Sequence, residues 1–165
     1  MSKLDFPDRH FAQAAEGWLE LGDPVEAGRE LDRISPAAAG HPVVLELRWR
    51  LLARNRDWAQ ALEVARTMTS AAPDQAEGWI HQSYTLHELR RTDEAWSTLL
   101  SVAERFPTES IIPYNLACYA CQLGDLTRAR DWLQRAVRLR SKDEIRSLAL
   151  TDPDLAPLRD YLQTL

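Results

Sequence analysis

The chain has 165 residues, of which 45% are hydrophobic and 27% are charged, and its formal net charge is −5. These values suit an ordinary folded domain and disfavour a nucleic-acid-binding protein, which is more often basic. Two cysteines are too few for a disulfide-stapled secreted domain. The N-terminus is charged and no long apolar run follows it, so we expect no signal peptide, no membrane partner and a cytoplasmic location.

Helix pairs follow one another along the chain. The pattern predicts helices at about 8–21 and 24–34, 42–54 and 58–71, 75–88 and 92–105, and 109–122 and 126–139, then shorter helices at about 142–150 and 154–163. Asp23, Asp57, Asp125 and Ser141 are predicted N-cap residues. Prolines separate the pairs because they cannot continue a helix interior. No strand is predicted, since β-branched residues never alternate over a useful length.

A period of 34 residues organises these pairs. One column of the repeat contains only alanine, at Ala27, Ala61, Ala95 and Ala129. A second column, four residues later, contains Leu31, Ala65, Leu99 and Leu133. Small residues let two helices approach closely, and large ones fill the space beside that contact. A helical pattern that repeats at this length is typical of stacked helix–turn–helix units, each of which buries its apolar face against its neighbours.

The fourth unit carries the most specific motif: Tyr114-Asn115-Leu116-Ala117, then Leu123-Gly124-Asp125, then Ala129 and Ala136. This run resembles the tetratricopeptide repeat family, apart from Pro113, where an aromatic residue is usual. Trp49 stands where the family has a small residue, and Arg90 and Arg91 replace the glycine and the acid of the third turn. The resemblance implies one all-α domain over residues 1–165, a right-handed α-α superhelix (solenoid). Its repeats are expected at about 8–41, 42–75, 76–109 and 110–141, with a C-terminal cap at 142–165.

The resemblance also implies a concave groove lined by the first helix of each pair. The family register places eight candidate partner-binding residues there: Glu16, Glu46, Arg50, Ile80, Tyr84, His87, Tyr114 and Cys118. The N-terminal half of this set is charged and the C-terminal half is aromatic and apolar. Such a surface suits a partner segment with one apolar anchor and flanking charge, with Tyr84 and Tyr114 as anchors and Arg50 as the charged contact. The alternative is a groove that is simply solvated or is filled by the chain's own terminus.

The sequence contains no convincing catalytic or metal-binding motif. Cys118 and Cys121 lie in the middle of a predicted helix with no strand nearby, so neither a redox centre nor a metal site is expected. Ser83 and His87 share a helix face, but no acid is placed to orient the histidine. We expect no catalytic residue and no cofactor. Two arginine groups, at 48–56 and 128–140, favour solvated charged faces over a phosphate track, so no nucleic acid is expected.

The sequence therefore predicts a non-enzymatic scaffold or adaptor that binds a protein or peptide partner in its concave groove. Two alternatives stay open. One is a dedicated chaperone or assembly factor for a client protein, and the other is a self-associating structural module, a homo-oligomer. Chaperone-binding members of the family hold a C-terminal carboxylate with a clamp of lysine, asparagine and arginine side chains. The corresponding positions of this sequence lack the ammonium and amide donors, so we expect no binding to the C-terminal tails of heat-shock chaperones.

Overall fold

The computed structural model describes residues 4–164, which form α-helices and short 3₁₀ helices and no strand. The fold is an all-α helical repeat, as the 34-residue period predicted. Contacts gather into two compact units, Met1–His81 and Gln82–Leu165, and the boundary falls inside helix α5 (Ala76–Glu88). The division of one domain into four repeats and a cap stays a prediction.

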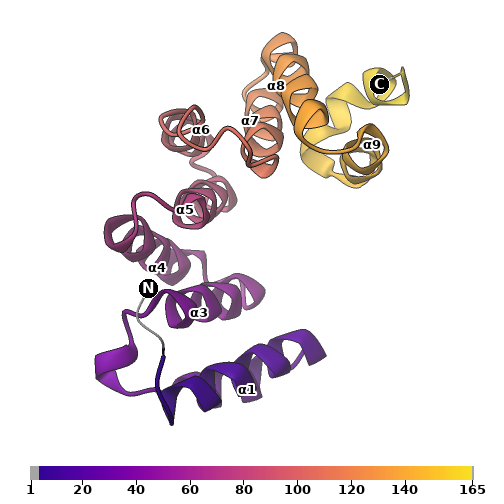
Figure 1. Ribbon diagram of the computed structural model, residues 1–165. Coiled ribbons are helices and arrows are strands. Elements are labelled where there is room, and N and C mark those ends of the chain that lie inside the picture. The colour runs from indigo at the N-terminus through magenta and orange to yellow at the C-terminus, as the bar shows by residue number, and fades with distance from the viewer. Residues whose placement is uncertain (1–3, 165) are drawn as a thin grey trace. The chain divides into compact units, whose positions relative to one another are not determined.

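The N-terminal unit contains two helix pairs (Figure 1). Helix α1 (Asp8–Leu21) packs on α2 (Pro24–Leu31), and α3 (Pro42–Arg54) packs on α4 (Trp58–Ala71). A 3₁₀ turn, η1 (Pro36–Ala38), joins the pairs. Helices α1 and α2 both contact α3, and the core that these helices share consists of Ala12, Ala15, Leu19, Ala27, Leu31, Ile34, Val44 and Leu47. Alanine dominates on α1 because a methyl group lets neighbouring backbones approach closely.

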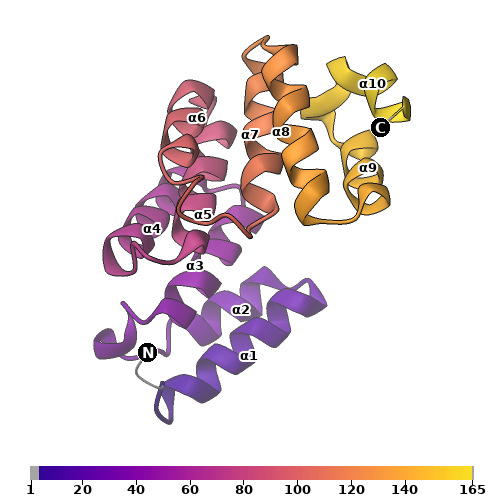
Figure 2. The same ribbon diagram turned by 45° about the horizontal axis from the view of Figure 1, so that its top comes forward.

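The C-terminal unit is built around helix α7 (Ile111–Gln122). Helix α6 (Thr92–Leu100) and helix α8 (Leu126–Leu139) pack on α7, as does η2 (Pro153–Leu158). Between α8 and η2 runs α9 (Lys142–Thr151), and α10 (Arg159–Thr164) follows η2 (Figure 2). Every residue of 112–121 is buried. A helix that is covered in this way has no charged face, which explains why α7 contains no charged residue.

The repeat columns form the core, as predicted. Ala27, Ala61, Ala95 and Ala129 are each 0% exposed, and the adjoining column of Leu31, Ala65, Leu99 and Leu133 is also buried. Trp49 is the large residue in a column otherwise formed by Ala15, Ser83 and Ala117. Its ring is half-buried and stacks on His81, with ring centroids 3.6 Å apart and planes 13° apart. Because the indole of Trp49 stacks on the ring of His81, the large side chain fits at this position of the repeat.

Caps and turns repeat with the same period. Asp57, Asp125 and Ser141 each accept a hydrogen bond from the backbone N–H three residues later, and Asp23 accepts two, from Val25 and Glu26. The predicted N-caps are therefore confirmed. The turn between the helices of a pair contains a residue with positive φ: Gly22 (85°), Arg56 (58°), Arg90 (63°) and Gly124 (84°). Glycine adopts this conformation without strain and arginine does not.

Some predicted helix boundaries were wrong. Helix α2 ends at Leu31 rather than at 34, and α6 ends at Leu100 rather than at 105. After Leu100 the backbone N–H groups of Val102 and Ala103 bond three residues back rather than four, which tightens the last turn into 3₁₀ geometry. Helix α5 begins at 76 rather than 75, and α7 begins at 111 rather than 109. The predicted helix at 154–163 is the 3₁₀ segment η2 followed by α10, and it contains Pro157, which has no N–H to donate.

Candidate functional site

A hollow of about 280 Å³ opens on the first helices of the N-terminal unit. Three predicted groove residues, Glu16 of α1 and Glu46 and Arg50 of α3, line it together. The other lining residues are Pro42, Val43, Leu47, Met68, Gln75 and Glu77. The family register placed these three side chains on one surface, and in the structure they line the same hollow.

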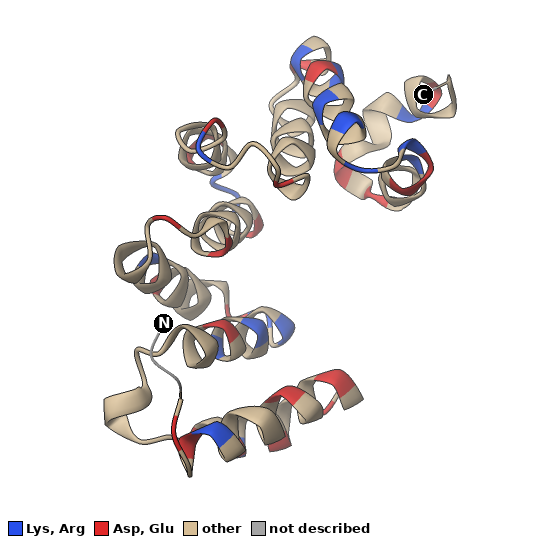
Figure 3. Cartoon of the chain, viewed as in Figure 1, with Lys and Arg blue, Asp and Glu red and all other residues tan. Residues whose placement is uncertain are grey.

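Acidic side chains outnumber basic ones around this hollow. The guanidinium of Arg50 lies 3.6 Å from the carboxylate of Glu16, and both side chains are substantially exposed. Glu46 contacts the ring of His81 at 2.7 Å. Glu77 adds a third carboxylate, and Figure 3 shows further acids along α1. Exposed ion pairs of this kind contribute little to stability, so these charges are available to a partner.

Two other arginines of α3 serve the fold instead. Arg54 donates to the carbonyl oxygen of Leu19 at the end of α1. Arg48 donates to the carbonyl oxygen of Leu31 at the end of α2. Each therefore adds a second donor to a carbonyl group at a helix C-terminus that already accepts the backbone N–H three residues later. Ile80, another predicted groove residue, is half-buried in α5.

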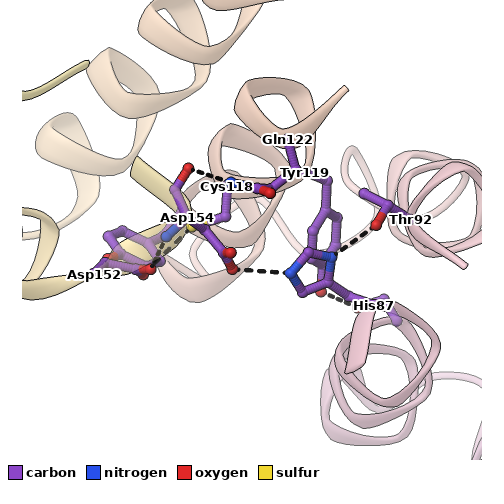
Figure 4. Close-up of polar contacts among 9 residues, drawn as sticks. His87, Thr92, Cys118, Tyr119, Gln122, Asp152 and Asp154 are labelled. Carbon is purple, nitrogen blue, oxygen red and sulfur yellow. Dashed lines mark hydrogen bonds and ion pairs between the residues drawn. The ribbon is translucent and has the colours of Figure 1, made fainter. Parts of the chain in front are cut away.

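In the C-terminal unit the corresponding surface is covered by η2 and the residue before it (Figure 4). The hydroxyl of Tyr114 donates to the carboxylate of Asp152 over 2.7 Å, and Cys118 donates to the same oxygen over 3.6 Å. The ring Nε2 of His87 lies 2.9 Å from Asp154. Tyr114 and Cys118 are 4% exposed and His87 is 8% exposed. Asp152 and the residues of η2 therefore cover these three side chains.

His87 has the acid that sequence reasoning did not find, so the expectation that no acid orients this histidine was wrong. Asp154 lies 67 residues away along the chain and is brought to Nε2 by η2. The other ring nitrogen, Nδ1, contacts the hydroxyl of Thr92 at 3.0 Å. Both ring nitrogens are thereby used, which leaves none for Ser83. The Ser83 hydroxyl instead accepts a hydrogen bond from Tyr119.

Burial and nearby negative charge raise the pKa of the two thiols and of the Tyr114 hydroxyl on this surface. Burial raises the pKa of Cys118 well above its usual value, and the carboxylates of Asp152 and Asp154 raise it further. The same causes raise the pKa of Cys121. Burial likewise raises the pKa of Tyr114, helped by Cys118 and Asp152. A reactive thiol needs a lowered pKa, so the Cys118–Cys121 pair has the wrong environment for a nucleophile.

Tyr84 is the predicted aromatic anchor that remains open to solvent, at 37% exposure. Burial, together with the charge of Glu88 and a hydrogen bond to it, raises the pKa of Tyr84 to about 12. Within residues 4–164, no group of three or more His, Cys, Asp or Glu side chains is placed to hold a metal ion. In the same range no helix combines the length and the apolar character needed to span a bilayer.

No family model and no curated protein matches this sequence. Several solved structures do match it. The chain is similar to MamA of Desulfovibrio magneticus RS-1, with a TM-score of 0.75 and 18% identity over 98% of this chain and 94% of that one. It is also similar to TTC0263, a thermophilic TPR protein of Thermus thermophilus, with a TM-score of 0.76 and 21% identity over 95% and 82%. PilF of Pseudomonas aeruginosa matches with a TM-score of 0.76 and 19% identity over 95% and 69%. Such low identities show the fold alone, which is an all-α helical repeat of the tetratricopeptide type.

Proposed function

We propose that this chain is a non-enzymatic interaction scaffold and that the hollow on α1 and α3 binds a segment of a partner protein. The observation that carries the proposal is the meeting of Glu16, Glu46 and Arg50 around one solvent-open hollow with an apolar floor. Leu47 and Met68 form the buried part of that floor, and Val43 forms an exposed part. An apolar floor within a polar rim is the usual anatomy of a site that takes one anchor side chain.

The charge of the rim indicates the chemistry of the partner. Three carboxylates, Glu16, Glu46 and Glu77, surround the hollow against the single guanidinium of Arg50. A segment with lysine or arginine beside one apolar side chain complements this rim, because opposite charges steer the encounter and fix the register. The same excess of carboxylates repels the phosphate groups of nucleic acid. Among the predicted groove residues of the C-terminal unit, Tyr84 is exposed, whereas Tyr114 and Cys118 lie beneath η2.

A peptide selection tests the proposal. A phage-displayed library of random short peptides is selected on the wild-type protein, and the winners are measured by fluorescence anisotropy. We expect peptides that combine basic residues with one large apolar residue. The double variant Glu16→Lys, Glu77→Lys reverses two exposed charges of the rim and should weaken these peptides by about tenfold or more, equivalent to about 1.4 kcal/mol.

The matched control is Glu20→Lys, Glu109→Lys, which makes the same change in net charge at exposed positions outside the hollow. It should bind the selected peptides as the wild type does. Equal weakening by both double variants would show a general effect of net charge. Peptides that bind all three proteins equally, or a selection without enrichment, would contradict a site on α1 and α3.

A further inference from the structure

A second hollow, of about 190 Å³, lies in the C-terminal unit between the segment after α6, the start of α7 and helix α8. Its walls are mainly apolar and include Phe106, Pro107, Ile112, Pro113, Trp132 and Leu139. The volume exceeds that of an apolar protein cavity of about 150 Å³ that holds a benzene ring. The hollow therefore has room for one aromatic side chain.

The repeat explains why this space is open. Pro113 stands one period after Trp79, just as Pro107 stands one period after Pro73. In the third repeat the indole Nε1 of Trp79 donates to the carbonyl oxygen of Pro73 over 3.0 Å. In the fourth repeat the proline ring of Pro113 has neither the size nor the N–H group to do the same. Among residues 4–164, no donor bonds the carbonyl oxygen of Pro107.

The rim of this hollow is basic, in a chain that is acidic overall. Helix α8 contains four arginines (Figure 3), of which two, Arg135 and Arg138, line the hollow. Arg135 lies over the ring of Trp132, 4.4 Å from its centroid, and pairs with Glu104 at 2.7 Å. Arg138 also lines the hollow and is exposed, and it makes no ion pair or hydrogen bond with any residue that the structure describes.

We propose that this hollow binds one aromatic side chain of an acidic partner segment. The ring enters the space that Pro113 leaves and packs against Trp132, where apolar burial and ring–ring contact favour it. A tryptophan N–H or a tyrosine O–H supplies the donor that the carbonyl of Pro107 lacks. Carboxylates beside the aromatic residue pair with the guanidinium of Arg138, which accepts them in a bidentate geometry. This site goes beyond the proposed function, because its occupant carries the opposite charge to the basic segment proposed for α1 and α3.

The probe is a fluorescein-labelled synthetic peptide with one tryptophan flanked by aspartates and glutamates, measured by anisotropy against the full chain. Two further peptides are compared with it, one with alanine for tryptophan and one with lysines for the acids. We expect the acidic tryptophan peptide to bind at least about tenfold more tightly than either, equivalent to about 1.4 kcal/mol. Its affinity should fall as salt is added, because exposed charge pairs are screened.

Two protein variants test the site itself. Pro113→Trp fills the hollow with the side chain of the preceding repeat, and Arg138→Glu reverses the charge of its rim without touching the core. Each should weaken the acidic tryptophan peptide by about tenfold or more. Arg159→Glu, at an exposed arginine outside the hollow, is the matched control and should leave the affinity unchanged. Circular dichroism verifies the folding of each variant, and Arg138→Glu alone decides the test if Pro113→Trp does not fold.

Several outcomes overturn the proposal. One is equal binding of the tryptophan and alanine peptides, and another is no measurable binding of the acidic tryptophan peptide to the wild type. Undiminished binding by Arg138→Glu shows that the rim is not used. Displacement of the peptide by an RNA oligonucleotide but not by the unlabelled peptide assigns α8 to phosphate binding instead. Growth of the particle in light scattering without peptide, abolished by Arg138→Glu, assigns the surface to a second copy of this chain.

Discussion

His87 of α5 and Asp154 of η2 lie 2.9 Å apart, between Nε2 and a carboxylate oxygen, although 67 residues separate them along the chain. Asp152 accepts from Tyr114 close by, and Gln122 donates to the backbone carbonyl of Asp154. These contacts hold η2 against α7, and Leu155 and Leu158 bury their side chains beside them. In the C-terminal unit, residues 152–158 therefore cover predicted groove residues, whereas the hollow of the N-terminal unit is open to solvent.

The contact between His87 and Asp154 predicts that removing the Asp154 carboxylate lowers the stability of the protein. Asp154→Ala leaves Nε2 of the buried His87 ring without its partner, and we expect the free energy of unfolding to fall by about 1–3 kcal/mol. Urea denaturation followed by circular dichroism measures this change. Asp160→Ala, an exposed position on α10, is the control and should change stability by less than about 0.5 kcal/mol. Equal effects of the two substitutions would show that η2 is not held by His87.

Alkaline pH should destabilise the C-terminal unit. Burial raises the pKa of Tyr84 to about 12 and also raises that of Tyr114. The folded state thus binds these protons more tightly than the unfolded state, whose tyrosines titrate near about pH 10. Their contribution is fully present below about pH 10 and is lost as pH rises toward the raised values.

Denaturation midpoints measured from neutral pH to above about pH 10 check this expectation. Tyr84→Phe and Tyr114→Phe should each reduce the alkaline loss, because the titrating hydroxyl is gone. Tyr114→Phe should also lower stability at neutral pH by about 1 kcal/mol, since Asp152 loses a donor. An alkaline profile unchanged in both variants would contradict the assignment.

The left-handed arginines predict stabilising substitutions. Arg56 and Arg90 occupy the turn position where Gly22 and Gly124 stand in the other pairs. A left-handed conformation destabilises the fold by roughly 1–2 kcal/mol when the residue is not glycine. Substitution by glycine removes this strain, but the greater entropy of glycine in the unfolded chain offsets part of the gain. Arg56→Gly and Arg90→Gly should therefore each raise the free energy of unfolding by about 0.5–1 kcal/mol.

Gly124→Ala is the reverse control for these turns. A Cβ at that position meets nothing within 4 Å, so the substitution isolates the backbone conformation from any clash. We expect it to lower stability by about 1 kcal/mol. Thermal unfolding measures all three variants. A stable Gly124→Ala together with destabilised arginine variants would show that these turns tolerate left-handed side chains for another reason.

The two cysteines should be inert in the folded protein. Burial and the carboxylates of Asp152 and Asp154 raise the pKa of both thiols. Because the thiolate is the reactive species, alkylation at neutral pH should be much slower for the folded chain than for the chain in urea. Asp152→Asn removes one of these charges and should speed the reaction of Cys118. Rapid modification of the folded wild type would contradict this picture.

The sequence by itself determined the helices, their caps and the repeat columns. These features depend on residues close together in the chain, such as Asp125 with Arg128, or on faces that recur every 34 residues. The register also brought Glu16, Glu46 and Arg50 together, because Arg50 stands one period after Glu16 and Glu46 lies one helical turn before Arg50 on the same face of α3. Even the departure at Pro113 is visible in the sequence, although the hollow that it leaves is not.

Only the tertiary structure decided which of the predicted groove residues are covered and which are exposed. Residues 152–154 look like a helix stop and a cap, and Asp152 does cap η2. No local pattern indicates that the same carboxylates also reach Tyr114 and His87, 38 and 67 residues earlier. Those contacts depend on how the tail packs against α7. That packing is set by the shape of a surface assembled from distant segments, and a period along the chain does not encode such a shape.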